Sequence, residues 1–285
     1  MQFGKVTIVG LGLIGGSLAW GLKESGDVRT VSGVDSDPGS VEYAVEAGII
    51  DEGSTDAAEA VSGAEVIVAA TYVGSIADTV KSLIPHAGDG AVITDVGSVK
   101  AGIVREIEGF IPERLGFVGG HPISGTENSG VRNAVLDLFG GKRFILTPTA
   151  KTPGAAKEKI SALWKLVGSD VYEMDPDSHD RIFGLVSHLP HAAAYALVDA
   201  ILSSEDPDTL LDFAGGGLRD YTRVASSSPE MWADIMTANR DNVLGAIRQL
   251  TESLSKIESA LEKGDRDALL KIFNAAADAK KDRIK

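Results

Sequence analysis

The stretch Lys5–Ser17, KVTIVGLGLIGGS, decides the fold. A short apolar strand pattern runs into the first of three glycines, and helical patterning follows the third. In this arrangement the glycines permit a tight turn, close approach of a pyrophosphate to the backbone, and close packing of helix on strand. The free N–H groups at the start of the helix then face the phosphates. The residues that we expect to hold a dinucleotide here are Gly10, Gly12, Leu13, Ile14 and Gly15.

An acidic residue at the end of the next strand strengthens this prediction. Asp35 follows the expected strand Thr30–Val34 and stands twenty residues after Gly15. A carboxylate at this place accepts hydrogen bonds from the adenosine ribose and repels a 2′-phosphate. Neither Ser36 nor Asp37 offers a cation that would bind such a phosphate. The pattern therefore favours NAD over NADP, and the alternative is a glycine-rich turn that binds nothing.

Short apolar strands alternate with helical stretches as far as Asp175, and only helical patterns follow it. Such alternation indicates βαβ units and a parallel sheet. We therefore predict an α/β fold: a doubly wound parallel sheet of the Rossmann type over residues 1–175, followed by an all-helical domain over residues 176–285. The expected strands are Val6–Val9, Thr30–Val34, Val66–Ala70, Ala91–Asp95, Gly116–Gly119, Arg143–Thr147 and Asp170–Glu173. The expected helices of the second domain are Pro176–Ser204, Pro207–Phe213, Pro229–Lys263 and Asp265–Lys281.

The long expected helix Pro229–Lys263 carries a regular apolar seam. Its residues alternate spacings of three and four, which is the pattern of a coiled coil. The seam either packs on the last helix of the same chain or is shared between two subunits. We favour the second interpretation and expect a homodimer. The seam residues are Val243, Ile247, Leu250, Leu254, Ile257 and Leu261.

Composition excludes several classes of function. The 285 residues include 27 Lys and Arg against 41 Asp and Glu, a net charge of −14, which disfavours binding to nucleic acid or an anionic membrane. There is no cysteine, so disulfides and thiolate metal ligands are excluded, and we expect no metal site. Glycines interrupt the apolar N-terminal run, and no uninterrupted apolar stretch elsewhere approaches the roughly 18 residues of a membrane span. We expect a cytoplasmic protein.

Polar residues that directly follow strands are the first candidates for chemistry, because dinucleotides bind at the carboxyl ends of parallel strands. Thr71 follows the third strand and is expected beside the diphosphate. Ser98 follows the fourth strand, and His121 follows the fifth within the loop Gly119–Gly130. A histidine here can take the proton of an alcohol while hydride leaves the same carbon. The alternative for His121 is a structural histidine at a strand end.

The helical half contains two further candidate motifs. Ser187–His191, SHLPH, places a proline inside a helix, where it removes a hydrogen bond and causes a kink. A glycine-rich loop over Ala214–Ala225 carries Arg219 and Arg223. Arginine is suited to bidentate binding of a carboxylate. For Arg219 a surface ion pair is an equal alternative.

Five motifs together resemble prephenate dehydrogenases of the TyrA family. They occur in the family's order and span nearly the whole chain. The family oxidises and decarboxylates prephenate to 4-hydroxyphenylpyruvate with NAD(P), on the route to tyrosine, and its fold is a Rossmann domain followed by an all-helical dimerisation domain. The motifs are Gly10–Ser17, Asp95–Lys100, Gly119–Gly130, Ser187–His191 and Gly215–Trp232.

The resemblance implies a role for each candidate residue. His121 would accept the proton of the ring hydroxyl, and Ser98 would orient both His121 and the nicotinamide. Arg223 would hold the ring carboxylate that leaves as CO2, and Asp220 would pair with either Arg223 or Glu127 and gate access. Gly216 and Trp232 would reach the pocket from a partner subunit. The other residues that would line the pocket are Thr126, Glu127, Ser187 and His191.

The resemblance leaves alternatives for the substrate and the activity. Some relatives use arogenate, but Glu127 and His191 match the pattern of those that use prephenate. Related two-domain β-hydroxyacid dehydrogenases have a catalytic lysine where this chain has SHLPH. A dimer that senses NAD without catalysis is the alternative from another class. We expect an NAD-dependent prephenate dehydrogenase.

Overall fold

The computed structural model describes residues 2–126 and 128–283. The chain divides into two compact units, Met1–Asn239 and Arg240–Lys285, which are described separately. The first unit contains the sheet and most of the helices.

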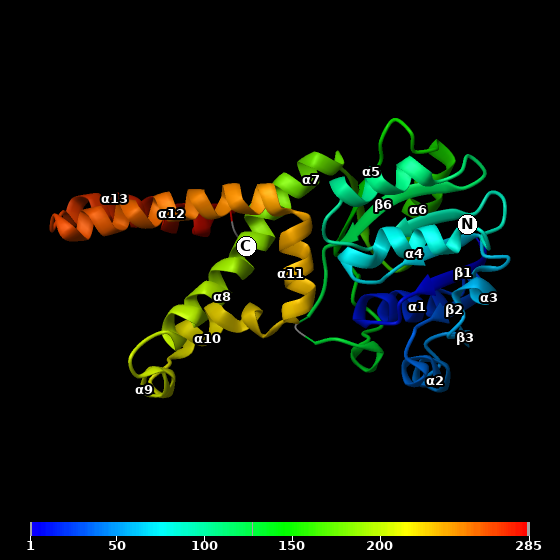
Figure 1. Cartoon of the computed structure of the whole chain (residues 1–285), viewed down its shortest axis with the longest axis horizontal. Coiled ribbons are helices and arrows are strands. Elements are labelled where there is room, and N and C mark those ends of the chain that lie inside the picture. The colour runs from blue at the N-terminus through cyan, green and yellow to red at the C-terminus, as the bar shows by residue number, and fades with distance from the viewer. Residues whose placement is uncertain (1, 127, 284–285) are drawn as a thin grey trace. The chain divides into compact units, whose positions relative to one another are not determined.

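The described residues of the first unit form a sheet of eight strands in the order β3-β2-β1-β4-β5-β6-β7-β8 (Figure 1). All neighbouring pairs are parallel except β6 and β7. The order of the first six strands is that of a Rossmann sheet. The strands are β1 (Phe3–Val9), β2 (Val28–Val34), β3 (Glu52–Ser54), β4 (Val66–Ala69), β5 (Val92–Asp95), β6 (Gly116–Pro122), β7 (Arg143–Thr147) and β8 (Asp170–Glu173).

Helices cover both faces of this sheet because side chains alternate along each strand. One core joins the strands to α1 (Leu13–Ser25) and α6 (Gly154–Leu166) through residues such as Leu18 and Trp164. The other joins them to α4 (Ile76–Leu83) and α5 (Ala101–Phe110). The predicted doubly wound α/β fold is therefore confirmed. The remaining helices of this half are α2 (Pro38–Glu46) and α3 (Ala57–Val61).

The helical part of the first unit starts directly after the sheet, and it contains two elements that the sequence does not predict. The chain from Pro176 to Leu202 is interrupted by a π-helical turn at Gly184–His188, just before Pro190. Proline has no N–H to donate and is tolerated in the first turn of the helix that follows. The expected glycine-rich loop is also largely helical, because glycine at a helix start costs little. The helices are α7 (Pro176–Phe183), α8 (Leu189–Leu202), α9 (Pro207–Asp212), α10 (Gly216–Thr222) and α11 (Pro229–Ala238).

The expected helix Pro229–Lys263 is wrong as a single element. It breaks at Asn239, whose backbone leaves the helical region at φ −106° and ψ 30°. The Asn239 side chain is buried and hydrogen-bonded to other parts of the first unit, so it holds the backbone in this conformation. α12 (Arg240–Glu262) then starts the second unit.

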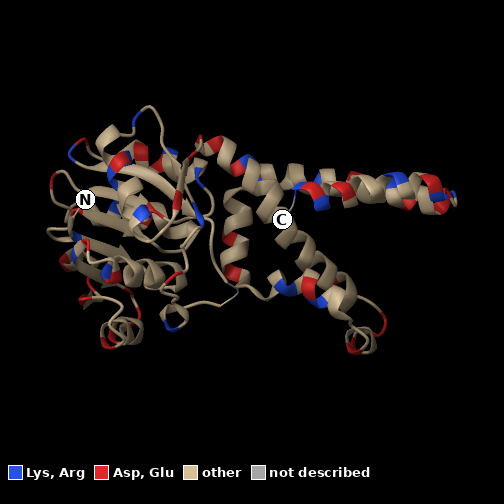
Figure 2. Ribbon diagram, turned by 180° about the vertical axis from the view of Figure 1, so that it is seen from behind, with Lys and Arg blue, Asp and Glu red and all other residues tan. Residues whose placement is uncertain are grey.

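The second unit is a helical hairpin in which α12 packs on α13 (Arg266–Arg283). Both helices carry acidic and basic residues along their length (Figure 2). Gly264 joins them with a positive φ of 62°. Seam residues Leu254 and Leu261 remain 57% and 63% exposed. A seam shared with another subunit stays a prediction.

The segment Pro176–Leu202 is long and apolar enough to cross a membrane, with a mean hydropathy of 1.3 in its most apolar window. α8, within it, is almost free of charged residues (Figure 2). One such helix is weak evidence for a membrane span. The polar residues His179, Asp180 and His188 of this segment are buried and form hydrogen bonds within the first unit.

Candidate active site

The glycine turn, Gly10–Gly15, joins β1 to α1. Gly10 has a φ of 103°, and a Cβ there would lie 2.6 Å from the Ala70 carbonyl oxygen. A Cβ on Gly15 would collide with the Gly10 carbonyl oxygen. Around Gly12, by contrast, no described atom lies within 4 Å of the Cβ position, and α1 begins there without a side-chain cap. The turn therefore leaves open space over unpaired helix N–H groups, as a diphosphate requires.

Asp35 directly follows β2 and holds the glycine turn. Its Oδ2 accepts a hydrogen bond of 2.8 Å from the Leu11 N–H, and its Oδ1 accepts one of 2.9 Å from the Asp37 N–H. A carboxylate has about four acceptor positions, so capacity remains for ribose hydroxyls. Thr71 lies just after β4, and its hydroxyl is 3.3 Å from that of Thr79.

Arg132 places a positive charge near α2 and Asp37 that the sequence next to Asp35 does not reveal. Arg132 stacks over the ring of Tyr43 in α2 at 4.5 Å. The Ser40 hydroxyl, the Gly39 N–H and, more weakly, the charge of Arg132 hold the pKa of Asp37 below its usual value. Ser36 and Asp37 offer no cation to a 2′-phosphate, whereas Arg132, which comes from the segment after β6, carries a positive charge close enough to act on Asp37.

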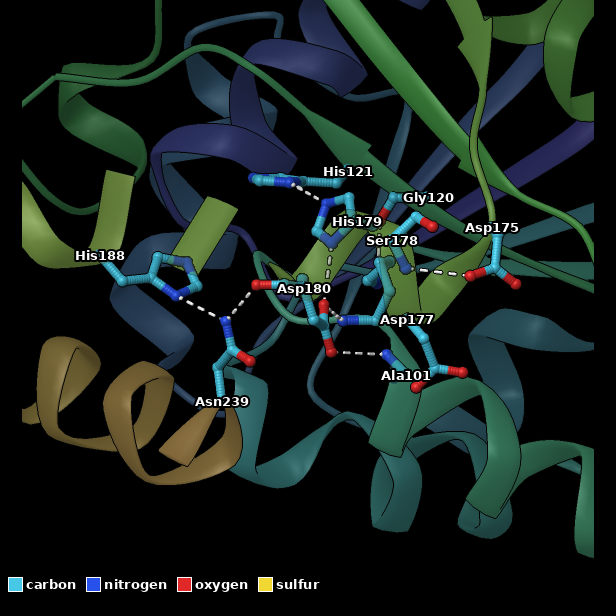
Figure 3. Close-up of polar contacts among 12 residues, drawn as sticks. Ala101, Gly120, His121, Asp175, Asp177, Ser178, His179, Asp180, His188 and Asn239 are labelled. Carbon is cyan, nitrogen blue, oxygen red and sulfur yellow. Dashed lines mark hydrogen bonds and ion pairs between the residues drawn. The ribbon is translucent and has the colours of Figure 1, made fainter. Parts of the chain in front are cut away.

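His121 stands near the end of β6 and starts a chain of hydrogen bonds (Figure 3). Its Nδ1 lies 2.8 Å from Nε2 of His179, and Nδ1 of His179 lies 2.8 Å from Oδ1 of Asp180. The ring of Phe183 packs against both imidazoles, with centroid distances of 5.1 and 4.5 Å. The His121 ring is therefore fixed on one side by α7, while β6 carries it.

The chain of bonds determines where the protons lie. A carboxylate only accepts, so His179 carries its hydrogen on Nδ1 and offers the Nε2 lone pair to His121. His121 then donates from Nδ1, and its Nε2 retains a free lone pair. Burial, and then the charges of His179 and Lys100, lower the pKa of His121 well below its usual value. Burial also lowers the pKa of His179 against the opposing effect of Asp180. His121 is thus a neutral base at neutral pH, with Nε2 as its accepting atom.

Asp180 also caps the helix α5 from the other half of the unit. Its two carboxylate oxygens accept hydrogen bonds of 2.7 Å from the Lys100 N–H and 2.8 Å from the Ala101 N–H. Burial would raise the pKa of Asp180, but the hydrogen bond with His179 and these two N–H groups keep it below its usual value. The carboxylate is therefore ionised and joins α7, α5 and His179.

A buried ion pair clamps the peptide before His121. Lys100 pairs with Asp95 at the end of β5, and both side chains are fully buried. Lys100 donates to the Gly120 carbonyl at 3.0 Å, and Asp95 accepts from the Gly120 N–H at 3.1 Å. Desolvation lowers the pKa of Lys100, and Asp95 opposes this effect. The N–H and the C=O of Gly120 are thus both held, which fixes the backbone next to His121.

A second pair of histidines comes from the π-helical turn and α8. His188 accepts at Nδ1 from the Asn239 amide at 3.0 Å, and burial lowers its pKa to about 4. His191 stacks on Trp232 at 3.5 Å and donates from Nδ1 to the Ser187 carbonyl at 2.9 Å. Burial lowers the pKa of His191, and the positive charge of Arg223 adds to this effect.

Among the expected residues, the structure brings His191 and Trp232 together, with the charge of Arg223 acting on His191. Ser98 lies half-buried between β5 and α5. Its backbone opposes the lowering of the His188 pKa by burial. Trp232 is stacked on His191 within one chain; its supply from a partner subunit stays a prediction, as it does for Gly216 at the start of α10. Thr126 is exposed, with its hydroxyl 3.2 Å from the Asn128 N–H. Glu127 lies outside the described residues.

Four residues that hold the site together are assigned no role from sequence. His179 and Asp180 follow a clear helix start, where Asp175 caps Ser178 and Pro176 occupies the first turn. A His-Asp pair in the first turns of a helix could have indicated a site residue. Here the pair lies near the N-terminal end of α7 and bonds to His121 of β6. A second such signal is Lys100, a long charged residue after the small or apolar residues Val96–Val99. Nothing in the local sequence marks Asn239.

We define the histidine network as His121, His179, Asp180, His188 and Asn239, five of the residues whose hydrogen bonds Figure 3 shows. Together with the glycine turn it has the groups that oxidation of an alcohol requires: open space over helix N–H groups at one strand end and a neutral base at another. No group of metal-ligating side chains is present among the described residues.

Comparison with known proteins gives matches in both halves of the chain. Residues 18–173 match the family model of the prephenate dehydrogenase nucleotide-binding domain, and residues 175–275 match that of its dimerization domain. The prephenate dehydrogenase of Bacillus subtilis (strain 168) is 36% identical over 276 residues, which are 96% of this chain and 74% of that protein.

Two solved structures extend the comparison to the fold. Prephenate dehydrogenase from A. aeolicus, in complex with hydroxyphenyl propionate and NAD+, has a TM-score of 0.90 and 38% identity, covering 99% of this chain and 98% of its own. Synechocystis arogenate dehydrogenase has a TM-score of 0.80 and 30% identity, covering 98% of both chains. The chain therefore belongs to the prephenate/arogenate dehydrogenase family, TyrA, a family of oxidoreductases with a nucleotide-binding Rossmann domain.

Proposed function

We propose that this chain is an NAD-dependent prephenate dehydrogenase that forms 4-hydroxyphenylpyruvate and CO2 in the biosynthesis of tyrosine. The observation that carries the proposal is the chain His121–His179–Asp180, which leaves a neutral base free at Nε2 of His121 beside the expected nicotinamide position. We further propose a homodimer in the cytoplasm, with residues 1–175 and 176–285 as its two domains.

The glycine turn fits the proposed cofactor. The open space around Gly12 and the uncapped start of α1 suit a diphosphate, with Leu13 and Ile14 in the first turn, and Asp35 suits the adenosine ribose. Thr71 would lie along the diphosphate. NAD, when bound, supplies the acceptor for a hydride. The A. aeolicus relative binds NAD+ in its crystal structure, which supports NAD over NADP here.

His121 would move the proton of the reaction. Its Nε2 accepts the hydrogen of the ring hydroxyl, so the oxygen can form a carbonyl as hydride leaves the same carbon. The bond between the ring and its carboxylate then breaks, its electron pair makes the ring aromatic, and CO2 leaves. The phenolate oxygen takes the proton back from His121. The base is therefore neutral again at the end of each turnover.

The other residues would bind and orient the substrate. Arg223 would hold the ring carboxylate, because a guanidinium matches a carboxylate in geometry and charge. Ser98 would orient His121 and the nicotinamide, which contributes to catalysis by limiting unproductive poses. The remaining residues proposed for the pocket are Thr126, Glu127, Ser187, His191, Gly216 and Trp232.

A second substrate is supported by one relative. Synechocystis arogenate dehydrogenase is 30% identical to this chain and similar over its whole length. Arogenate carries the same ring hydroxyl and ring carboxylate as prephenate, so the proposed roles of His121 and Arg223 apply to both. The two substrates differ in the side chain of the ring: prephenate has a pyruvyl group, and arogenate has an amino acid group in its place.

The direct test crosses prephenate and arogenate with NAD and NADP and follows the absorbance of the reduced nicotinamide. The expected result is the highest kcat/KM for prephenate with NAD. A higher value for arogenate would contradict the proposed substrate, and a higher value for NADP would contradict the proposed cofactor. Binding of NAD without turnover of either substrate would instead support a sensing dimer.

A further inference from the structure

Asn239 occupies a central place in the histidine network although it is far from the strand ends in sequence. It is the last residue of the first unit and 3% exposed. Its Nδ2 donates to the Asp180 carbonyl at 2.8 Å and also lies 3.0 Å from Nδ1 of His188 (Figure 3). An amide nitrogen has two hydrogens, and here each has an acceptor.

The first hydrogen bond reaches the His121 side of the site. It holds the main chain of Asp180, whose carboxylate bonds His179 and the first N–H groups of α5. His179 in turn sets the tautomer of His121. A shift of the Asp180 main chain would therefore displace the carboxylate on which the tautomer of His179 depends.

The second hydrogen bond reaches the Ser98 side. Because Asn239 donates to Nδ1, neutral His188 carries its hydrogen on Nε2. That atom is buried and has no hydrogen-bond partner among the described residues, while the Ser98 backbone opposes the lowering of the His188 pKa. The charged groups around His188 are Asp180, His179 and His191. In this tautomer neutral His188 keeps one donor, Nε2–H, and the loop that carries Ser98 acts on the same ring.

We propose that Asn239 is a positioning residue for the proposed dehydrogenase reaction: it holds His188 in the Nε2–H tautomer and Asp180 in place, and so aligns Ser98 with His121. The inference rests on the proposed function, since it assigns Ser98 and His121 to one reaction. Asn239 would act through Asp180 and His188 and not on the substrate itself.

The test replaces Asn239 by aspartate and by alanine. Asn239→Asp keeps the shape of the side chain but presents oxygens to two acceptors, so His188 must move its hydrogen to Nδ1 or become protonated. The matched control is Asn274→Asp, the same substitution at an exposed position of α13. The first readout is nitrogen NMR of the histidine rings, of which there are only five, because it distinguishes the two tautomers and needs no substrate.

The expected wild-type spectrum has His188 as the Nε2–H tautomer with a pKa near 4. In Asn239→Asp the His188 pKa rises, and kcat with prephenate and NAD falls about 100-fold, while the affinity for NAD stays constant. Asn239→Ala should lower kcat without raising the His188 pKa, and Asn274→Asp should change neither quantity.

Two outcomes would overturn the inference. One is a wild-type His188 that carries its hydrogen on Nδ1, which needs no variant to fold. The other is a folded Asn239→Asp with unchanged kcat. If the wild type shows the expected tautomer but turns over neither substrate, the proposed function fails, while the assignment of Asn239 as the donor to His188 is supported.

Discussion

The glycine turn and the histidine network build function in opposite ways. In the glycine turn the backbone itself is the binding surface, and six consecutive residues, Gly10–Gly15, contain it. In the histidine network side chains from β6, α7, the π-helical turn and the end of α11 meet through hydrogen bonds between residues as far apart as Asp180 and Asn239. The first depends on the absence of side chains, and the second on the donor and acceptor pattern of specific ones.

The difference predicts how each region responds to substitution. A change in the glycine turn should alter cofactor affinity and leave the chemistry of bound molecules intact. A change in the histidine network should alter kcat and its pH dependence and leave cofactor affinity intact.

The largest effect is expected for His121→Asn. The amide cannot take a proton at neutral pH, so kcat with prephenate and NAD should fall about 1000-fold. Calorimetry should find NAD affinity unchanged. His86→Asn, at an exposed position, is the matched control. A His121→Asn variant with wild-type kcat would remove the base from the mechanism.

His179→Asn tests whether the network sets the state of the base. It removes the acceptor that holds His121 in the Nδ1–H tautomer, so kcat should fall about 100-fold. Because His179 also helps to lower the pKa of His121, the acid limb of the pH profile should move to higher pH. A drop in kcat with an unmoved limb would assign His179 a packing role only.

Arg223→Ala should act on substrate binding. Loss of a charge-assisted hydrogen bond to a carboxylate raises KM for prephenate about 10- to 100-fold, with a smaller effect on KM for NAD. Arg105→Ala, which removes an exposed ion pair with Asp177, is the control for loss of a positive charge. An unchanged KM for prephenate would exclude Arg223 as the carboxylate ligand.

Gly12→Ala should give the smallest effect and reveal the backbone-built site. The added methyl group enters open space, so the melting temperature should not change. It also enters the path of the diphosphate, so NAD affinity should fall about tenfold. Gly109→Ala, another glycine with open space at its Cβ position, should leave NAD affinity unchanged. Equal affinity in Gly12→Ala and the wild type would place the diphosphate elsewhere.

The two regions also differ in what the sequence predicts. Seven strands, the Rossmann type of the fold and the glycine turn follow from sequence patterns, because strand periodicity and glycine spacing are local properties. β3 is missed because its three residues, Glu52–Ser54, lack an apolar pattern. The position of His121 at a strand end is also predicted from sequence alone.

The partners of His121 are beyond local patterns. His179 lies 58 positions away, and Asn239 is 59 positions from Asp180. Their roles arise only when α7 and α11 pack against the end of the sheet. The break at Asn239 has the same origin: an apolar seam predicts one continuous helix, while a buried amide with two acceptors in the first unit ends α11.

The pH dependence of kcat, measured in wild type and His121→Asn with saturating prephenate and NAD, tests the central claim most directly. Burial lowers the pKa of His121, so the wild-type base stays neutral as the pH falls through the ordinary histidine range. The expected profile is therefore flat through pH 6.5, with an acid limb at lower pH, and the limb is lost in His121→Asn. Profiles that coincide in height and shape would show that His121 Nε2 does not take the proton.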